Sequence, residues 1–240
     1  ARDIFKAMTD LIPEGERPAG IAVFQEKTDW GNEEGGLFKA MAAPAGYEIV
    51  YYAEYAPGNT DFSTMIAEAQ AAGAEALFAM PTTPDGITIV KQVAESAWKP
   101  KLIMMNRAPD AATWGEATAA AGNGVVFFAG WDNGETFPGV AELNAKSQAD
   151  VGRDADILVG PAYACVQILA DAIERAGTLD RDTVRDAIAD TDMDTVIGPV
   201  TFNADGTGNV LNPMDQWQDD EMQLVWPADM QTADFLYPLP

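Results

Sequence analysis

The sequence predicts an α/β fold organised around an open parallel β-sheet. Short apolar runs recur at a spacing of roughly 25 residues, which is about the length of one strand–helix unit. Each run is apolar on both faces, as in strands that helices cover on both sides of a sheet. Segments with helical periodicity separate the runs. These three observations predict a series of consecutive strand–helix units.

Four such units lie between Ala19 and Met105. The predicted strands cover residues 21–24, 49–52, 76–80 and 102–105. The predicted helices between them cover residues 33–43, 62–72 and 85–98. In the second helix, Asp61 is placed to cap the first turn and Gly73 to end the last.

Further elements flank these four units. Helices are predicted at residues 1–11, 111–121, 139–150, 157–176 and 180–189. A strand is predicted at residues 125–128, and residues 200–202 precede a turn signal at 203–206. A hairpin joins 214–218 to 222–226, and residues 235–240 are expected to be extended. The segment 131–138 is rich in Asp, Asn, Gly and Pro, so we interpret it as a crossing between two lobes.

The charge of the chain excludes several classes of partner. It carries 38 acidic and 14 basic residues, a formal net charge of −24. No basic patch is available to neutralise phosphates, which argues against a nucleic-acid partner and against anionic membrane surfaces. No apolar run is long enough to span a bilayer, so membrane insertion is not expected.

The absence of histidine restricts the chemistry further. It removes Ser-His-Asp and Cys-His catalysis and the commonest metal ligand. The single cysteine, Cys165, lies among apolar residues at helical spacing and is predicted to be a buried structural thiol. The glycines between Gly31 and Gly36 do not form G-x-G-x-x-G, and two glutamates there would repel phosphate. We therefore predict no enzyme activity, no metal and no cofactor.

The predicted sheet implies a ligand site. In open parallel sheets, ligands bind beyond the carboxyl ends of the strands. Here those ends carry an aromatic and polar set, which consists of Trp30, Tyr55, Thr82, Thr83, Asn106 and Arg107. An aromatic platform, neutral hydrogen-bonding groups and one cation suit a small polar organic ligand.

Two of these residues have alternative interpretations. Because an indole that is left exposed to water is costly, Trp30 is either a ligand platform or a packing residue at a lobe interface. Arg107 either meets a negative group on the ligand or pairs with a nearby Asp or Glu. The residue pattern alone leaves both alternatives open.

The helices between residues 139 and 189 present a different problem. Leu158, Cys165, Leu169 and Ile173 share one face of the longest helix. An apolar helix face must pack on another element, and no strand separates these helices. We expect an incomplete layer that exposes an apolar surface.

Several segments together resemble one family. They are Ile21-Ala-Val-Phe24, Asp29-Trp30-Gly31, Thr60-Asp-Phe-Ser63, the run from Ala67 to Gly73, Gly198-Pro-Val-Thr-Phe202 followed by Asp205-Gly206, Val225-Trp-Pro227 and Tyr237-Pro-Leu-Pro240. Their order and spacing resemble the branched-chain amino-acid type of ABC-transporter solute-binding protein across essentially the whole chain.

The resemblance implies a type I periplasmic-binding-protein fold with two Rossmann-like parallel-sheet lobes that clamp a ligand. It implies that the first lobe lacks its N-terminal half here. Residues 1–130 would then form the second-lobe sheet domain, 131–198 the helices of the incomplete first lobe, and 199–240 the return crossing with the C-terminal hairpin and tail.

The resemblance also assigns site residues. Trp30 matches an aromatic position that covers the ligand, and Leu158 matches an apolar wall position. Thr82 falls where amino-acid binders have a second aromatic, and Asn106 where they have an acid that pairs with the ligand ammonium. Arg107 and Trp131 are added from their places beside Asn106 and at the crossing. The two departures make a carboxylate, an amide or an aromatic acid as plausible a ligand as a free amino acid.

The function that the resemblance implies is capture of a small organic solute in the periplasm and its delivery to an ABC permease. The alternative is a ligand-sensing domain of a receptor or of an amide-responsive regulator on the same fold. A His-free hydrolase or epimerase finds no supporting group of residues.

Overall fold

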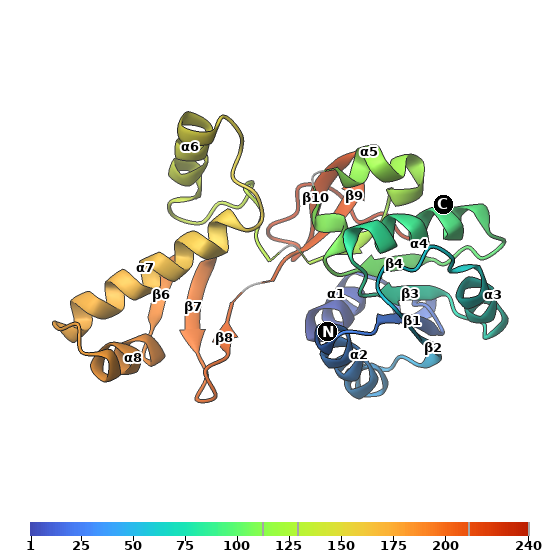
Figure 1. The fold of residues 1–240 in the computed structure, drawn as a ribbon, viewed down its shortest axis with the longest axis horizontal. Coiled ribbons are helices and arrows are strands. Elements are labelled where there is room, and N and C mark those ends of the chain that lie inside the picture. Colours follow the sequence, from blue (N-terminus) through green and yellow to red (C-terminus); the bar gives the residue numbers. More distant parts are fainter. Residues whose placement is uncertain (112, 129, 211, 240) are drawn as a thin grey trace. The chain divides into compact units, whose positions relative to one another are not determined.

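The computed structural model describes residues 1–240 except Ala112, Ala129, Leu211 and Pro240. The chain forms two compact units. Unit 1 consists of Ala1–Phe128 and Met214–Pro240, and unit 2 of Ala129–Pro213. Each is described by itself below, and the elements are labelled in Figure 1.

As far as the structure describes it, the sheet of unit 1 consists of five parallel strands and an antiparallel hairpin. The parallel strands are β1 (Ile21–Glu26), β2 (Ile49–Tyr55), β3 (Ala76–Ala79), β4 (Leu102–Met105) and β5 (Val126–Phe127), and the hairpin is β9 (Met214–Gln218) with β10 (Glu221–Trp226). Among the described residues the strand order is β10-β9-β5-β4-β3-β1-β2. The hairpin pairs with β5 through Val126 and Gln216, which covers what would otherwise be an open strand edge.

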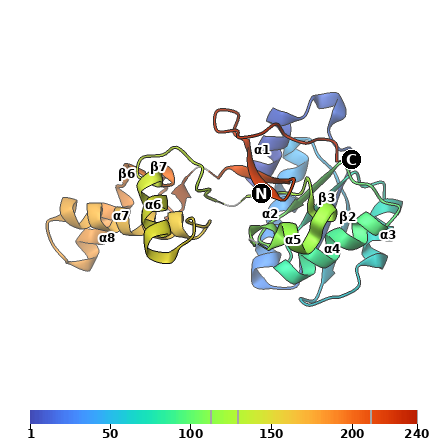
Figure 2. The same ribbon diagram turned by 90° about the horizontal axis from the view of Figure 1, so that it is seen from above.

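Helices cover both faces of this sheet (Figures 1 and 2). They are α1 (Arg2–Leu11), α2 (Asp29–Ala42), α3 (Ser63–Ala71), α4 (Thr83–Glu95) and α5 (Trp114–Thr118), with 3-10 turns at Glu14–Glu16, Ala43–Ala45, Ala108–Asp110 and Ala119–Gly122. The prediction of a doubly covered parallel sheet is confirmed.

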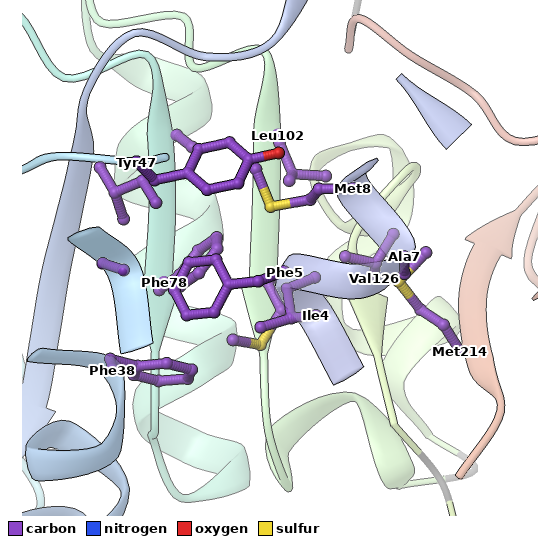
Figure 3. Close-up of a cluster of buried hydrophobic side chains, with 14 of the residues drawn as sticks. Ile4, Phe5, Ala7, Met8, Phe38, Tyr47, Phe78, Leu102, Val126 and Met214 are labelled. Atoms are coloured by element: carbon purple, nitrogen blue, oxygen red, sulfur yellow. The ribbon is translucent and has the colours of Figure 1, made fainter. Parts of the chain in front are cut away.

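The core beneath α1 and α2 is aromatic. Figure 3 shows Phe5 of α1 among Phe38, Tyr47 and Phe78, with ring centroids 6.3, 5.5 and 5.8 Å from that of Phe5. Because side chains alternate along a strand, the neighbouring residue of Phe78, Leu77, faces the other layer. Both residues are fully buried, which explains why each strand has an uninterrupted apolar sequence.

Helix α2 begins four residues earlier than the sequence suggests. The Thr28 side chain accepts a hydrogen bond from Gly31 N and caps the first turn. Gly31 allows a close approach of the helix to the end of β1, because a Cβ there would lie 2.1 Å from the carbonyl oxygen of Glu26. This glycine therefore lets α2 start soon after β1, which places Trp30 in the first turn of the helix.

Helix α5 is shorter than predicted. The expected helix 111–121 includes position 112, which lies outside the described residues. The α-helical part is Trp114–Thr118, and Ala119 then adopts a positive φ of 48°. The Thr118 hydroxyl donates to Trp114 O at 2.7 Å within this last turn.

In its described residues, unit 2 contains three α-helices and a small antiparallel sheet. The elements are α6 (Val140–Val151), α7 (Val159–Ala176), α8 (Arg181–Ala189), β6 (Asp192–Thr195), β7 (Gly198–Phe202) and β8 (Gly208–Asn209). The strand order in the described residues is β6-β7-β8. The division of the chain thus differs from the predicted boundaries at 131–198 and 199–240, because β7 and β8 belong with the helices and the β9–β10 hairpin with unit 1.

Helix α7 buries mostly small residues and exposes several large apolar ones. Gly160, Ala164, Ile168 and Ala172 are its buried residues. The opposite side is exposed, with Leu158 72%, Val166 64% and Leu169 45% accessible. The predicted apolar surface is confirmed. Cys165 shares this exposed side, so the prediction of a buried thiol is wrong: the face expected to pack is the face left open in this chain.

Strand β6 was not predicted because its sequence is polar. Asp192 and Asp194 are exposed, and Thr195 is the buried residue of its pattern. Such a strand lies at the edge of a sheet, where acidic side chains discourage further pairing. Among the described residues, no helix in either unit combines the length and apolar character needed to cross a bilayer.

We expect the outward face of α7 and its following turn to bind hydrophobic dye without supporting the fold. A Val166→Ser/Leu179→Ser double variant should lower the fluorescence of bound anilinonaphthalene sulfonate while changing the free energy of unfolding by only about 0.5 kcal/mol per site, because both side chains are exposed. Ile168→Ala, on the buried side, should cost about 2–5 kcal/mol. Equal destabilisation by the two variants would contradict the exposure of this face.

We also expect a pH-dependent instability of unit 2. Glu135 is 5% exposed, and its Oε2 has no hydrogen-bond partner among the described residues. Burial raises the pKa of Glu135 to about 7, the hydrogen bond from Asp132 N opposes the rise, and the charge of Asp132 adds to it. Because the folded state holds this proton more tightly than the unfolded state, stability should fall as the pH rises from about 4.5 through 7.

The Glu135→Gln variant removes this penalty. Thermal unfolding followed by circular dichroism should give a higher Tm than the unmodified chain at pH 8 and no difference near pH 4. Glu142→Gln, at an exposed site in the first turn of α6, is the matched control and should show no such pH dependence. A Tm gain that is the same at both pH values would contradict the assignment.

Candidate functional site

Trp30 and Arg107 lie together at the carboxyl edge of the unit 1 sheet. Trp30 belongs to the first turn of α2, which follows β1, and Arg107 follows the end of β4. The Arg107 guanidinium carbon lies 4.5 Å from the centroid of the Trp30 ring. This is a cation–π contact, in which the ring face attracts the positive charge. The structure therefore joins the aromatic and the cation that the sequence places far apart.

Arg107 is held by a strained turn. Its φ and ψ are 73° and −49°, in a region that L-residues other than glycine rarely adopt. The amide of Ala108 donates to Asn106 O at 3.0 Å, which closes a three-residue γ-turn around Arg107. This turn carries the Arg107 side chain out to an exposed position beside Trp30. Backbone strain of this kind concentrates at functional sites.

Asn106 is fixed from one side only. Its Nδ2 donates to Glu34 Oε1 at 3.0 Å, and Glu34 lies one turn after Trp30 on α2. The other end, Oδ1, is buried and finds no hydrogen-bond partner among the described residues. A buried acceptor without a donor is costly, so this oxygen is a candidate ligand contact. The sequence analysis did not single out Glu34, because its contact with Asn106 joins residues 72 positions apart and has no local signal.

Thr82 reaches the same edge through its backbone. Its amide donates to Glu26 Oε2 at 3.1 Å, and Glu26 is the last residue of β1. Glu26 is 1% exposed. The carboxylate therefore ties the loop after β3 to the end of β1. The sequence signal for Glu26 was a carboxylate close to the end of a predicted apolar strand.

Two more polar groups lie near Arg107. The Tyr55 hydroxyl is buried without a hydrogen-bond partner among the described residues. Burial raises the pKa of Tyr55, the charges of Asp85 and Glu26 add to this, and Arg107 opposes it. Burial raises the pKa of Asp110 to about 7, again against the effect of Arg107. The Tyr55 hydroxyl is therefore neutral at pH 7, and Asp110 is partly protonated at that pH.

The other two predicted site residues belong to unit 2. Trp131 is fully buried, and its Nε1 donates to Val196 O at 2.8 Å. A Cβ at Gly160 would lie 2.2 Å from the Trp131 ring, so the indole is a packed core residue with no accessible surface. This geometry does not support direct ligand contact by Trp131. Leu158 is exposed on the outward face of α7.

The arrangement in unit 1 is suited to binding rather than to chemistry. It presents an indole, a guanidinium and a neutral amide oxygen at one sheet edge, close to a buried phenol. In the described part of the chain, no three His, Cys, Asp or Glu side chains are grouped to hold a metal ion. These residues can recognise an organic molecule through stacking, charge and hydrogen bonds.

Comparison with known proteins agrees with this geometry. The family model described as periplasmic binding protein matches residues 7–218. The Leu/Ile/Val-binding protein homolog 3 of Brucella melitensis is 25% identical over 213 residues, which cover 87% of this chain and 56% of that protein. The chain spans about half the length of the curated relatives it matches.

Solved structures share the fold at low sequence identity. A leucine-binding protein from Thermotoga maritima superposes with a TM-score of 0.80 and 18% identity, covering 92% of this chain and 63% of that chain. A leucine-, isoleucine-, valine-, threonine- and alanine-binding protein from Brucella ovis gives a TM-score of 0.80 and 16% identity, covering 90% and 55%. These matches confirm a periplasmic-binding-protein type I fold of which the chain contains a part.

We expect glycine to relieve the strain at position 107. The variants Arg107→Gly and Arg107→Ala both lose the cation–π contact, so their difference reports the backbone alone. Urea unfolding should show the glycine variant about 1 kcal/mol more stable, since a positive φ costs about 1–3 kcal/mol and glycine loses about 0.4–1 kcal/mol through the unfolded chain.

The control is Lys39, which lies over the Tyr52 ring at 3.5 Å but sits in a regular helix. There the order should reverse, with Lys39→Gly about 1 kcal/mol less stable than Lys39→Ala. An alanine variant at position 107 that equals or exceeds the glycine variant in stability would show that the turn is unstrained.

Proposed function

We propose a function from the premise that this chain belongs to the periplasmic binding protein family, whose model matches residues 7–218. In this proposal the chain is the part of a solute-binding protein that captures a small organic solute in the periplasm for delivery to an ABC permease. The solute is an amino acid, an amide or an aromatic or other carboxylic acid. Unit 1 supplies one wall of the binding site.

The observation that carries the proposal is the meeting of Trp30, Asn106 and Arg107 at the carboxyl edge of the parallel sheet. This is the edge at which open α/β sheets bind ligands. The three side chains come from two strand ends, Trp30 after β1 and the other two after β4, and both Asn106 and Arg107 present unused binding capacity. Relatives whose names state branched-chain amino-acid binding support a solute of similar size.

The proposal contains no chemical step. Binding of a solute requires contacts that are better in the bound state than in water, and an indole with fixed polar neighbours provides them. Catalysis would need a nucleophile and a base within hydrogen-bond reach of each other. The groups described above instead hold each other in place, as Glu34 does for Asn106 and Glu26 for the Thr82 amide.

A thermal-shift screen tests the proposal. The chain should be screened against amino acids, amides and aromatic acids at millimolar concentration. A solute at ten times its Kd stabilises the folded state by about 1.4 kcal/mol, which raises the Tm by a few degrees for a unit of this size. If no member of the three classes shifts the Tm, the proposed function is wrong.

We predict that Trp30→Ala weakens binding of any solute found in this screen by about 1–3 kcal/mol, because a buried aromatic contact is lost. Isothermal titration calorimetry measures the change. Leu37→Ala is the matched control, since Leu37 lies on the same helix and is exposed; its affinity should be unchanged. Unchanged affinity in Trp30→Ala would assign the indole to packing alone.

A further inference from the structure

The unpaired cation at the carboxyl edge of unit 1 indicates which class of solute this edge binds. Arg107 is one of 14 basic residues in a chain with 38 acidic ones. Within the part of the chain that the structure describes, no carboxylate forms an ion pair with its guanidinium. An acidic protein that keeps a cation exposed and unpaired leaves that cation available to an anion from outside.

The surrounding carboxylates are occupied by the protein itself. Glu26 accepts from the Thr82 amide, and Asp85 accepts from the Gly58 amide at 3.0 Å. Glu34 accepts from Asn106. Asp110 differs, because one of its oxygens has no hydrogen-bond partner among the described residues, but burial raises its pKa to about 7 against the effect of Arg107, so it is partly protonated near pH 7. The local acids therefore compete little with an incoming anion for Arg107.

The position of Arg107 is fixed in advance. The strained γ-turn sets its backbone, and the contact with Trp30 at 4.5 Å sets its side chain. A guanidinium stacked on a ring presents its N–H groups at its edge, where a carboxylate accepts two parallel hydrogen bonds. Holding the side chain in place before binding reduces the entropy lost when the ligand arrives.

The Asn106 side chain sets a second requirement on the groups that the solute carries. Its Nδ2 is held by Glu34, and its Oδ1 is a neutral acceptor that is buried without a hydrogen-bond partner among the described residues. A neutral oxygen satisfies an O–H or N–H donor, but it offers a ligand ammonium no opposite charge. The pair of neighbours thus combines a cation for one end of the solute with a neutral acceptor for another.

We propose that unit 1 selects carboxylate solutes that carry a neutral O–H or N–H donor and no ammonium group, with the carboxylate on Arg107 and the donor on Asn106 Oδ1. This inference rests on the proposed function and narrows its solute class. Arg107 is the specificity-determining residue, and the Trp30 indole beside it favours a flat apolar body between the two polar ends.

The test uses three probes on the 240-residue chain: 4-hydroxybenzoate, its methyl ester and benzoate. The ester removes the negative charge, and benzoate removes the donor. Binding is followed by the shift of the Trp30 indole N–H resonance, assigned with Trp30→Phe. 4-Hydroxybenzoate should bind at least tenfold more tightly than the ester and more tightly than benzoate, and its affinity should fall as salt is added.

Variants separate charge from shape. Arg107→Gln should weaken 4-hydroxybenzoate at least tenfold and leave the ester unchanged, whereas Arg107→Lys should retain part of the affinity. Asn106→Asp should weaken the acid by placing a negative charge beside it. Lys39→Gln, which removes another ring-stacked cation outside the site, should have no effect. Circular dichroism of each variant confirms that it is folded.

The outcomes distinguish this inference from the proposed function. If the ester binds as well as the acid, or if Arg107→Gln does not change the affinity for the acid, the inference is wrong. If L-leucine binds and 4-hydroxybenzoate does not, the proposed function stands and the solute class proposed here is wrong. If no solute of the screen or of this set binds, both are wrong.

Discussion

The burial of β1 on both faces is the constraint on which the rest of unit 1 depends. All six of its residues are buried, including Glu26 at its carboxyl end. A buried carboxylate is tolerated only with hydrogen-bond donors, and the Thr82 amide supplies one. The close approach of α2, made possible by Gly31 against the Glu26 carbonyl, follows from the same burial. Trp30 therefore stands at the sheet edge because β1 is fully enclosed.

Stability and recognition oppose each other at the end of β4. A glycine would fit the positive φ at position 107 without strain, yet the chain places an arginine there. The interactions that hold it are the γ-turn and the Trp30 ring, both local to the edge. Strain maintained in this way gives a side chain one defined position, which suits a site that must be organised before its ligand arrives. Unit 2 also has a surface that does not serve stability. On the exposed face of α7, apolar side chains remain without a partner in the described residues.

The sequence was sufficient for the fold wherever apolar periodicity carries the information. The strands of unit 1, the hairpin and the long helices appear close to their predicted bounds, and the site edge follows from strand polarity alone. Contacts set by three-dimensional packing were not predictable: the stacking of Arg107 on Trp30 joins residues 77 positions apart, and the outward turn of Cys165 depends on which side of α7 finds a partner. The polar edge strand β6 was missed for the same reason, because its local pattern does not differ from that of a loop. The burial of Trp131 was likewise not evident from its place at the crossing.

Hydrogen exchange of backbone amides, with and without the tightest-binding solute of the screen, tests the central claim most directly. The account places the solute at the carboxyl edge of the unit 1 sheet, so exchange should slow in residues 27–34 and 106–110. The turn between β9 and β10, at Asp219 and Asp220, lies at the opposite edge because β9 runs antiparallel to β5. Its exchange should not change. Protection confined to that turn, or to unit 2, would contradict the account.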